Sequence, residues 1–310
     1  MSNTAALEDA TQSITQTLDA ACTRHPALES LMHAFAPVLT IRTELVAAIT
    51  ETLRQAPDHP VHAIATTTTN DVILLAEHDI SWAVEFYPLM EERLFPVLAG
   101  LNTFAADIDT FSKEAANEPE LVVSLLTALL NGNKDALEAL ASTFHLPVEK
   151  LHFIGHQMLC CVLGAVTAIH SEALRSLFWR ESYCPVCGSF PDISTHQRPD
   201  VDQSEYLAGG GGKKMMHCPT CDHQWHFRRG TCPACGNEDT GAIHYFHVDG
   251  NVSERVEYCT SCNHYLLNID LRNIAKTPDL RAAPLTLLHL DILAQEKKLS
   301  PLYRSLFNTF

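Results

Sequence analysis

The chain has 310 residues, of which 46% are hydrophobic and 19% are charged, and its formal net charge at pH 7 is −16. This composition is typical of a folded globular protein with a sizeable core. The acidic balance argues against a nucleic-acid-binding protein, which usually presents a basic face to phosphates, and against attachment to an anionic membrane surface. It is compatible with a partner that presents a basic surface.

Residues 1–20 lack the charged segment followed by an apolar segment that marks a secretory signal. No uninterrupted apolar run approaches the length that spans a membrane. We therefore expect a cytoplasmic protein without membrane insertion. In that reducing compartment, paired cysteines at metal-ligand spacing are expected to be ligands rather than disulfides.

Residues 1–180 are predicted to form a helical domain, because apolar residues recur at three- and four-residue spacing and glycines are few. Early prolines, Pro37 among them, are expected to separate the first helices. Pro147 suits the first turn of a long final helix, where its missing N–H costs nothing. The predicted helices cover residues 40–53, 72–99 with a break near Pro88, 102–111, 119–130, 135–144 and 148–179.

This helical domain offers little chemistry. Cys160 and Cys161 are expected to be small core residues, because adjacent helical side chains point about 100° apart and do not form a redox pair. His152 and His156 have the spacing of a metal-binding pair. They lack the intervening Glu of a His-Glu-x-x-His motif, so histidines at the edge of the core are favoured.

A cysteine-rich region begins near residue 181 and contains four Cys-x-x-Cys pairs. Each pair presents two sulfurs on one side of a tight turn, which is half of a tetrahedral metal site. Eight thiolates complete two sites with none left over. The pairs are Cys184 and Cys187, Cys218 and Cys221, Cys232 and Cys235, and Cys259 and Cys262.

The order of turns and strand-like runs is written twice, in residues 181–230 and again in residues 231–272. This repetition predicts two tandem rubredoxin-like or zinc-ribbon modules, each pairing its own two turns; a cross-braced pairing of the first turn with the third is the alternative. The residue after each second cysteine is expected to relax the turn, and these residues are Gly188, Asp222, Gly236 and Asn263. The Gly-rich segment 198–213 is expected to be a flexible hairpin tip.

Four thiolates suit either zinc or mononuclear iron. They saturate the metal and leave no open position for an activated water, so metal-assisted hydrolysis is disfavoured. A thiol oxidoreductase is also disfavoured, since the pairs do not open helices that would lower a thiol pKa. No convincing Ser-His-Asp set or dinucleotide-binding motif is present, and we predict no catalytic residues and no enzyme activity.

Residues 273–310 are predicted to be helical and to pack back on the helical domain. An apolar stripe of Leu285, Leu288 and Ile292 supports this prediction. Asp291 lies off the stripe, and we expect it to be a solvated or capping carboxylate.

The cysteine-rich region resembles the formate dehydrogenase accessory protein family, FdhE. The resemblance covers about residues 180–295. It is carried by Tyr183-Cys-Pro-Val-Cys-Gly-Ser189, by His217-Cys-x-x-Cys221 followed by Trp225-His226, by the third pair, by His244-Tyr245, and by the fourth pair with Tyr265-Leu266 after it. Two departures are Asn263, where Gly would suit the turn, and the long Gly-rich loop of the first hairpin.

The resemblance implies a cytoplasmic maturation factor or chaperone that is needed for active formate dehydrogenase and is not itself an enzyme. Its expected partner is the catalytic subunit of that enzyme, before twin-arginine export. The expected cofactors are two mononuclear metal ions, each held by four of the eight cysteines, with iron favoured over zinc. The two rival functions are a rubredoxin-like one-electron carrier and a zinc-ribbon nucleic-acid-binding protein. The oligomeric state is left open.

Overall fold

The structure is a computed structural model that describes residues 3–67, 72–76, 78–101, 104–198, 212–305 and 308. The chain divides into two compact units, Met1–Leu177 and Phe178–Phe310. This division lies close to the change in composition at residue 180. The expected flexible tip at 198–213 lies, apart from its ends, outside the described residues.

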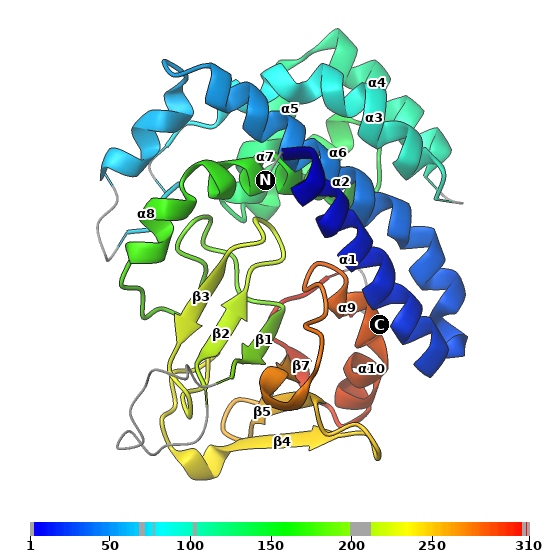
Figure 1. The fold of residues 1–310 in the computed structure, drawn as a ribbon. Helices are drawn as coiled ribbons and strands as arrows, with labels where there is room; N and C mark the ends of the chain where they lie inside the picture. The colour runs from blue at the N-terminus through cyan, green and yellow to red at the C-terminus, as the bar shows by residue number, and fades with distance from the viewer. Residues whose placement is uncertain are drawn as a thin grey trace. The chain divides into compact units, whose positions relative to one another are not determined.

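The first unit is helical, as predicted (Figure 1). Pro37 lies inside the second helix and does not end it, contrary to our expectation. Packing of that helix against its neighbours outweighs the hydrogen bond lost at a proline. The α-helices are α1 (Asn3–Arg24), α2 (Glu29–Gln55), α3 (Tyr87–Ala99), α4 (Ala105–Asn117), α5 (Glu120–Leu130), α6 (Lys134–Thr143), α7 (Val148–Ile169) and α8 (Ser171–Ser176), and the 3-10 helices are η1 (Pro26–Leu28), η2 (Pro60–Thr67) and η3 (Ser81–Phe86).

Helix α7 is the buried centre of this unit and packs against α2 and α5. Two glycines allow the close approach. A Cβ atom at Gly155 would lie 2.6 Å from Leu129 Cδ1, and one at Gly164 would lie 2.7 Å from Val46 Cγ2. The helix ends at Ile169 and not near residue 179 as predicted. His170 leaves the helical conformation, and its Nε2 contacts the Val61 carbonyl oxygen at 2.9 Å.

Two helical segments, Pro26–Gln55 and Val148–Ile169, are long and apolar enough to cross a membrane by length and composition alone. Neither segment is the uninterrupted apolar run considered in the sequence analysis, because charged residues such as Glu44 and Glu149 interrupt them. Core helices of soluble proteins pass the same test, and most of Val148–Ile169 is buried within its own unit. The finding is therefore weak support for a membrane span.

The second unit is built on one seven-stranded sheet with the order β3-β2-β1-β6-β5-β4, and β7 pairs with β6. The elements are β1 (Ile193–His196), β2 (Lys214–His217), β3 (Gln224–Phe227), η4 (Thr240–Ala242), β4 (Ile243–His247), β5 (Glu254–Cys259), β6 (His264–Asp270), η5 (Leu271–Asn273), α9 (Ala283–Thr286), α10 (Leu288–Glu296) and β7 (Ser300–Pro301).

The two predicted modules share this sheet and are not separate sheets. Each contributes an antiparallel three-stranded meander, β1-β2-β3 or β4-β5-β6. Strands β1 and β6 then pair in parallel, with Ser194 opposite Asn268. The Asn268 side-chain amide donates to Ser194 Oγ at 2.8 Å. The modules are therefore held together by main-chain and side-chain hydrogen bonds.

One face of the sheet is apolar and packs against the C-terminal helices. Ile193, Val256 and Leu267 form a buried cluster with Leu287 and Leu290 of the α9–α10 segment. The predicted closing helix is thus present. It packs against the sheet, and its expected packing against the helical domain stays a prediction.

Asp291 on α10 lies inside this interface and is 2% exposed, so the expectation of a solvated or capping carboxylate is wrong. It accepts a hydrogen bond of 2.6 Å from the Tyr265 hydroxyl. Burial raises its pKa to about 7. The face that α10 buries against the sheet is wider than the apolar stripe alone, and Asp291 lies on that wider face.

The opposite face of the sheet is polar and largely buried. Lys214 on β2 forms an ion pair with Glu257 on β5, and the two side chains are 0% and 3% exposed. Arg255 Nε donates to Asn268 Oδ1 at 2.6 Å, and Arg255 also pairs with Asp270 at 3.2 Å. The Lys214–Glu257 ion pair therefore joins the two modules on this face, whereas these Arg255 contacts lie within the second module.

Candidate metal centres

Each Cys-x-x-Cys pair forms a tight turn of the same kind. The backbone N–H after the second cysteine donates to the carbonyl oxygen of the first cysteine, at 2.8–3.1 Å in all four turns. The residue that carries this N–H has a positive φ: 77° at Gly188, 60° at Asp222, 72° at Gly236 and 58° at Asn263. Glycine, asparagine and aspartate are the residues that adopt this conformation most readily. The predicted role of these four positions is confirmed.

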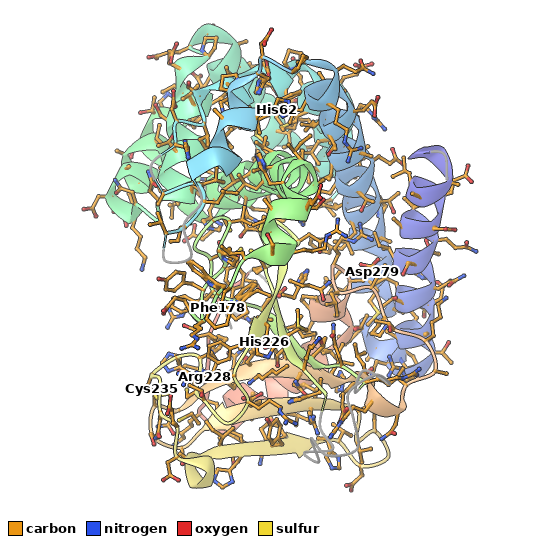
Figure 2. All side chains as sticks on the ribbon, turned by 60° about the vertical axis from the view of Figure 1, so that its left-hand side comes forward. His62, Phe178, His226, Arg228, Cys235 and Asp279 are labelled. Carbon is orange, nitrogen blue, oxygen red and sulfur yellow. The ribbon has the colours of Figure 1, made fainter. Side chains whose placement is uncertain are left out.

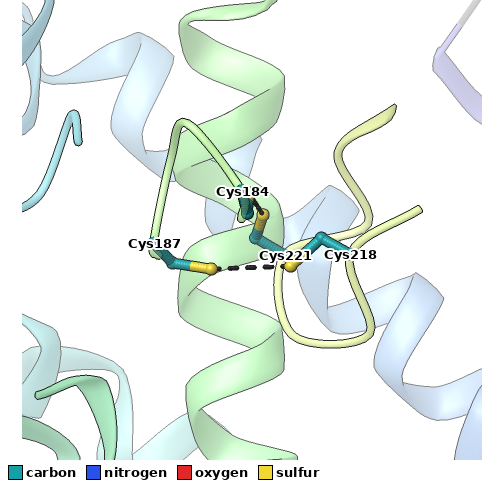
Figure 3. A group of neighbouring side chains, drawn as sticks. All are labelled: Cys184, Cys187, Cys218 and Cys221. Atoms are coloured by element: carbon teal, nitrogen blue, oxygen red, sulfur yellow. Dashed lines mark hydrogen bonds between the residues drawn. The ribbon is translucent and has the colours of Figure 1, made fainter. Parts of the chain in front are cut away.

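The first site brings together Cys184, Cys187, Cys218 and Cys221, all of them buried (Figure 3). The Sγ atoms of Cys184 and Cys221 are 3.4 Å apart, and those of Cys187 and Cys218 are 3.5 Å apart. The two turns come from the segment before β1 and from the β2–β3 connection. The β1–β2 pairing brings these segments together, so the first predicted turn pairs with the second and not with the third.

The second site brings together Cys232, Cys235, Cys259 and Cys262. The Sγ atoms of Cys232 and Cys262 are 3.7 Å apart, and those of Cys235 and Cys259 are 3.9 Å apart. Its turns precede β4 and connect β5 to β6. The sulfur atoms of each group lie within 4.8 Å of one another.

These groups fit a tetrahedral metal ion. A metal–sulfur bond of about 2.3 Å gives a tetrahedron with sulfur–sulfur edges of about 3.8 Å, and the observed distances fall on both sides of this value. They are far longer than the sulfur–sulfur bond of a disulfide, about 2.05 Å. Four sulfur donors suit zinc or iron equally well. The assignment of the eight cysteines as ligands stays a prediction that the geometry supports.

The electrostatics of the first site also call for a cation. Burial raises the pKa of the Cys184, Cys218 and Cys221 thiols, while hydrogen bonds from these neighbours lower that of Cys187. Four thiolates cannot all ionise together in a dry site without a compensating charge. A metal cation bound there would supply that charge.

In the second site, burial raises the pKa of Cys259, but hydrogen bonds from the backbone of Cys262 and Ser261 and from the side chains of Cys232 and Cys262 together lower it to about 7. Burial raises the pKa values of Cys232 and Cys262. One thiolate is thus favoured before a metal arrives. It provides a first ligand, and the metal charge then stabilises the remaining three thiolates.

A side-chain bridge ties the two turns of each site, and the sequence analysis missed it. In the first site the hydroxyl groups of Ser189 and Thr220 are 3.0 Å apart. In the second site the Asn237 side-chain amide donates to Ser261 Oγ at 2.8 Å. Both bridges join the residue two places after a second cysteine to the third residue of the opposite turn. That shared spacing is the signal that would have revealed them.

His217 is a further positioning residue at the first site. Its Nδ1 lies 2.8 Å from Asp192 Oδ1, and its Nε2 lies 2.8 Å from Asp222 Oδ1. Burial lowers the pKa of the imidazole, but the two carboxylates outweigh it and raise the pKa to about 10. A cationic His217 therefore links Asp222 of the second turn to Asp192, which precedes β1. The sequence analysis noted His217 in the His217-Cys-x-x-Cys221 motif but did not predict its two carboxylate partners. Asp192 is distant in sequence, and Asp222 was interpreted only as a turn residue.

The other three cysteines do not join these sites. Cys160 and Cys161 are buried in α7, as predicted, and Cys160 Sγ lies 3.6 Å from His156 Nδ1. Cys22 contacts the Met32 sulfur at 3.6 Å. His152 and His156 have stacked rings with centroids 5.8 Å apart, and burial lowers the pKa of His152. Among the described residues, they belong to no group of three metal-ligand side chains.

Several proteins that are similar to this chain in sequence carry the name FdhE or FdhE homolog. No family model matches the sequence. A protein FdhE homolog from Aquifex aeolicus is 33% identical over 120 residues, which are 38% of this chain and 39% of the relative. Protein FdhE from Escherichia coli is 26% identical over 219 residues, which are 67% of this chain and 62% of the relative. The chain thus matches less than two thirds of the length of each of these relatives.

A solved structure extends the likeness to the whole fold. The crystal structure of the FdhE protein from Pseudomonas aeruginosa matches with a TM-score of 0.65 and 18% sequence identity, over 96% of this chain and 95% of that chain. At this identity the match establishes the fold alone. The chain is thus similar in part of its sequence to proteins named FdhE, and it shares the fold of one of them.

Proposed function

We propose that this protein is an accessory factor that is required for the formation of active formate dehydrogenase. It binds the catalytic subunit of that enzyme in the cytoplasm, before twin-arginine export, and catalyses no reaction itself. The family likeness reported above supports this role. The observation that carries it is the pair of four-cysteine groups, because a metal held by four sulfurs has no position left for a substrate.

The two metal ions, iron favoured over zinc, would fix the four tight turns and the sheet between them. A metal held by residues from two turns contributes folding free energy directly. The sites thereby give the second unit a rigid surface for recognition. The net charge of −16 favours association with a basic surface on the partner.

The test is complementation in a strain that lacks the gene. The wild-type chain should restore formate dehydrogenase activity in cell extract. A tagged copy should capture the catalytic subunit, identified by mass spectrometry. A Cys184→Ser variant should lose both effects, and a Cys22→Ser variant, which changes a cysteine outside the two sites, should retain them. Full formate dehydrogenase activity without the gene would overturn the proposal.

A rubredoxin-like electron carrier is the second candidate, and the exposure of Cys235 favours it, because electron transfer needs a site near the surface. The iron-loaded protein would then show a reversible visible band and a defined midpoint potential. A protein that holds only zinc in cells would exclude this function. Binding of DNA or RNA that weakens with salt would instead support the nucleic-acid alternative, which the negative charge opposes.

A further inference from the structure

The two four-cysteine sites follow one plan but differ in their access to solvent. Cys187 and Cys235 occupy the same position, the second cysteine of the first turn, and each faces the first cysteine of the opposite turn. Cys187 is 7% exposed. Cys235, by contrast, is exposed (Figure 2). The same contrast separates Cys221, which is buried, from Cys262, which is half-buried. The first site therefore serves as a control for the second site, because the two differ in exposure and not in the kind of ligand.

The surroundings of the two sites differ in the same direction. Cys187 Sγ lies 3.4 Å from the Ser189 hydroxyl, and Thr220, the other half of the bridge, is buried. The corresponding bridge of Asn237 and Ser261 is exposed.

A shallow cleft open to solvent lies beside the second site. Cys232, Cys259, Pro233 and Ala234 are among its lining residues. Glu257 also lines the cleft, and its Oε2 is buried without a hydrogen-bond partner among the described residues. The cleft therefore brings solvent next to two cysteines of the second site.

We propose that the second site is a ligand-exchange centre, at which the Cys235 sulfur leaves the metal and the sulfur of an incoming thiol takes its place, while the first site keeps its four ligands. This inference rests on the metal binding proposed above. The bond from the metal to Cys235 breaks, and a bond from the metal to the incoming sulfur forms. The proton of the incoming thiol passes to Cys235, so charge is conserved and no electron is transferred.

Access decides which site exchanges. An incoming thiol must approach the metal before or as the old ligand leaves, so a buried cluster excludes it and an exposed one admits it. Both sites offer the same donor atoms and the same turn geometry. Exposure, and not chemistry, is therefore the variable that separates them.

The test uses the full chain loaded with cobalt(II), whose visible spectrum reports four-thiolate coordination. The variants are Cys235→Ser and its matched control Cys187→Ser. Each should lose the four-thiolate signal of one site. Adding 2-mercaptoethanol, a small thiol with a hydroxyl donor, should restore the signal in Cys235→Ser and not in Cys187→Ser. Rescue of both variants alike, or of neither, would overturn the proposal.

A second measurement needs no variant. Iodoacetamide applied to the metal-loaded wild-type protein, followed by mass spectrometry, should alkylate Cys235 at least about tenfold faster than Cys187. Equal rates would overturn the proposal even if Cys187→Ser failed to fold. If neither site bound cobalt in the wild-type protein, the proposed metal function itself would fail, which is a different result from two metal sites of equal reactivity.

The size of the incoming thiol identifies its source. Rescue by 2-mercaptoethanol and also by a thiol attached to a large polyethylene glycol would indicate that a cysteine on a protein surface reaches the site. Rescue by the small thiol alone would assign the position to a small-molecule thiol. Both results support exchange at Cys235.

Discussion

The buried ion pair between Lys214 and Glu257 offers the sharpest test of how the second unit is held together. Lys214 belongs to the first module and Glu257 to the second, and both are almost completely removed from solvent. Among the described residues, Glu257 Oε2 has no hydrogen-bond partner, and the Lys214 ammonium lies 5.9 Å from the centre of the Phe227 ring. The pair is therefore a contact between the two modules, and water could not replace either partner as a hydrogen-bonding group.

Lys214→Met removes the cation and leaves a carboxylate in a dry site. Loss of one partner of a buried pair costs about 3–5 kcal/mol, whereas apolar replacement of both partners is often neutral or stabilising. We expect Lys214→Met to lower the free energy of unfolding of the second unit by about this amount. The double variant Lys214→Met/Glu257→Met should return to within about 1 kcal/mol of the wild type.

Hydrogen exchange followed by mass spectrometry is the suitable assay, because it reports on β2 and β5 separately from the helical unit. Amides in these strands that exchange only through unfolding should exchange about a hundredfold to a few thousandfold faster in Lys214→Met. The double variant should exchange at close to the wild-type rate. A double variant that is less protected than Lys214→Met would refute the view that an unpaired carboxylate causes the loss.

Three further predictions concern other parts of the chain. The pKa of Asp291 is raised to about 7 from an ordinary 3.8, so between these pH values the native state holds a proton that the unfolded state has released. The stability that this proton gives is complete below about pH 4 and is lost as the pH rises through 7. Asp291→Asn should therefore become more stable relative to wild type between pH 4 and pH 8, by up to about 4 kcal/mol in urea unfolding, and a difference that does not vary with pH would contradict the assignment. Asn263→Val should lower the melting temperature and weaken metal retention at the second site, because a β-branched residue with a φ of 58° costs at least about 1–2 kcal/mol, whereas Asn263→Gly should retain both. Gly164→Ala should destabilise the helical unit by about 1–3 kcal/mol in denaturant unfolding, since its Cβ would lie 2.7 Å from Val46, and an unchanged midpoint would show that α2 shifts freely.

The sequence was most informative where structure is decided by neighbouring residues. The four turns follow from the cysteine spacing together with a residue that accepts a positive φ, and both are local properties. The pairing of turns within each module also follows, because an antiparallel hairpin joins segments that are close in sequence. The helical character of the first unit follows from apolar spacing alone.

Features that depend on distant contacts were not predictable. The parallel pairing of Ser194 with Asn268 joins two modules whose sequences read as independent repeats. Asp291 is buried because α10 lies against the sheet, and its sequence neighbours do not indicate this. The contrast between Cys187 and Cys235 is likewise invisible in the sequence, since both follow a Cys-Pro-x motif and precede a glycine.

The most direct test of the central claim is the metal content of the purified full chain, measured anaerobically by native mass spectrometry and elemental analysis. We expect two metal ions per chain in the wild type, one in Cys184→Ser and one in Cys259→Ser, with two retained in Cys22→Ser. A wild-type chain that folds without bound metal, or that loses both ions when either single site is changed, would contradict two independent four-cysteine centres.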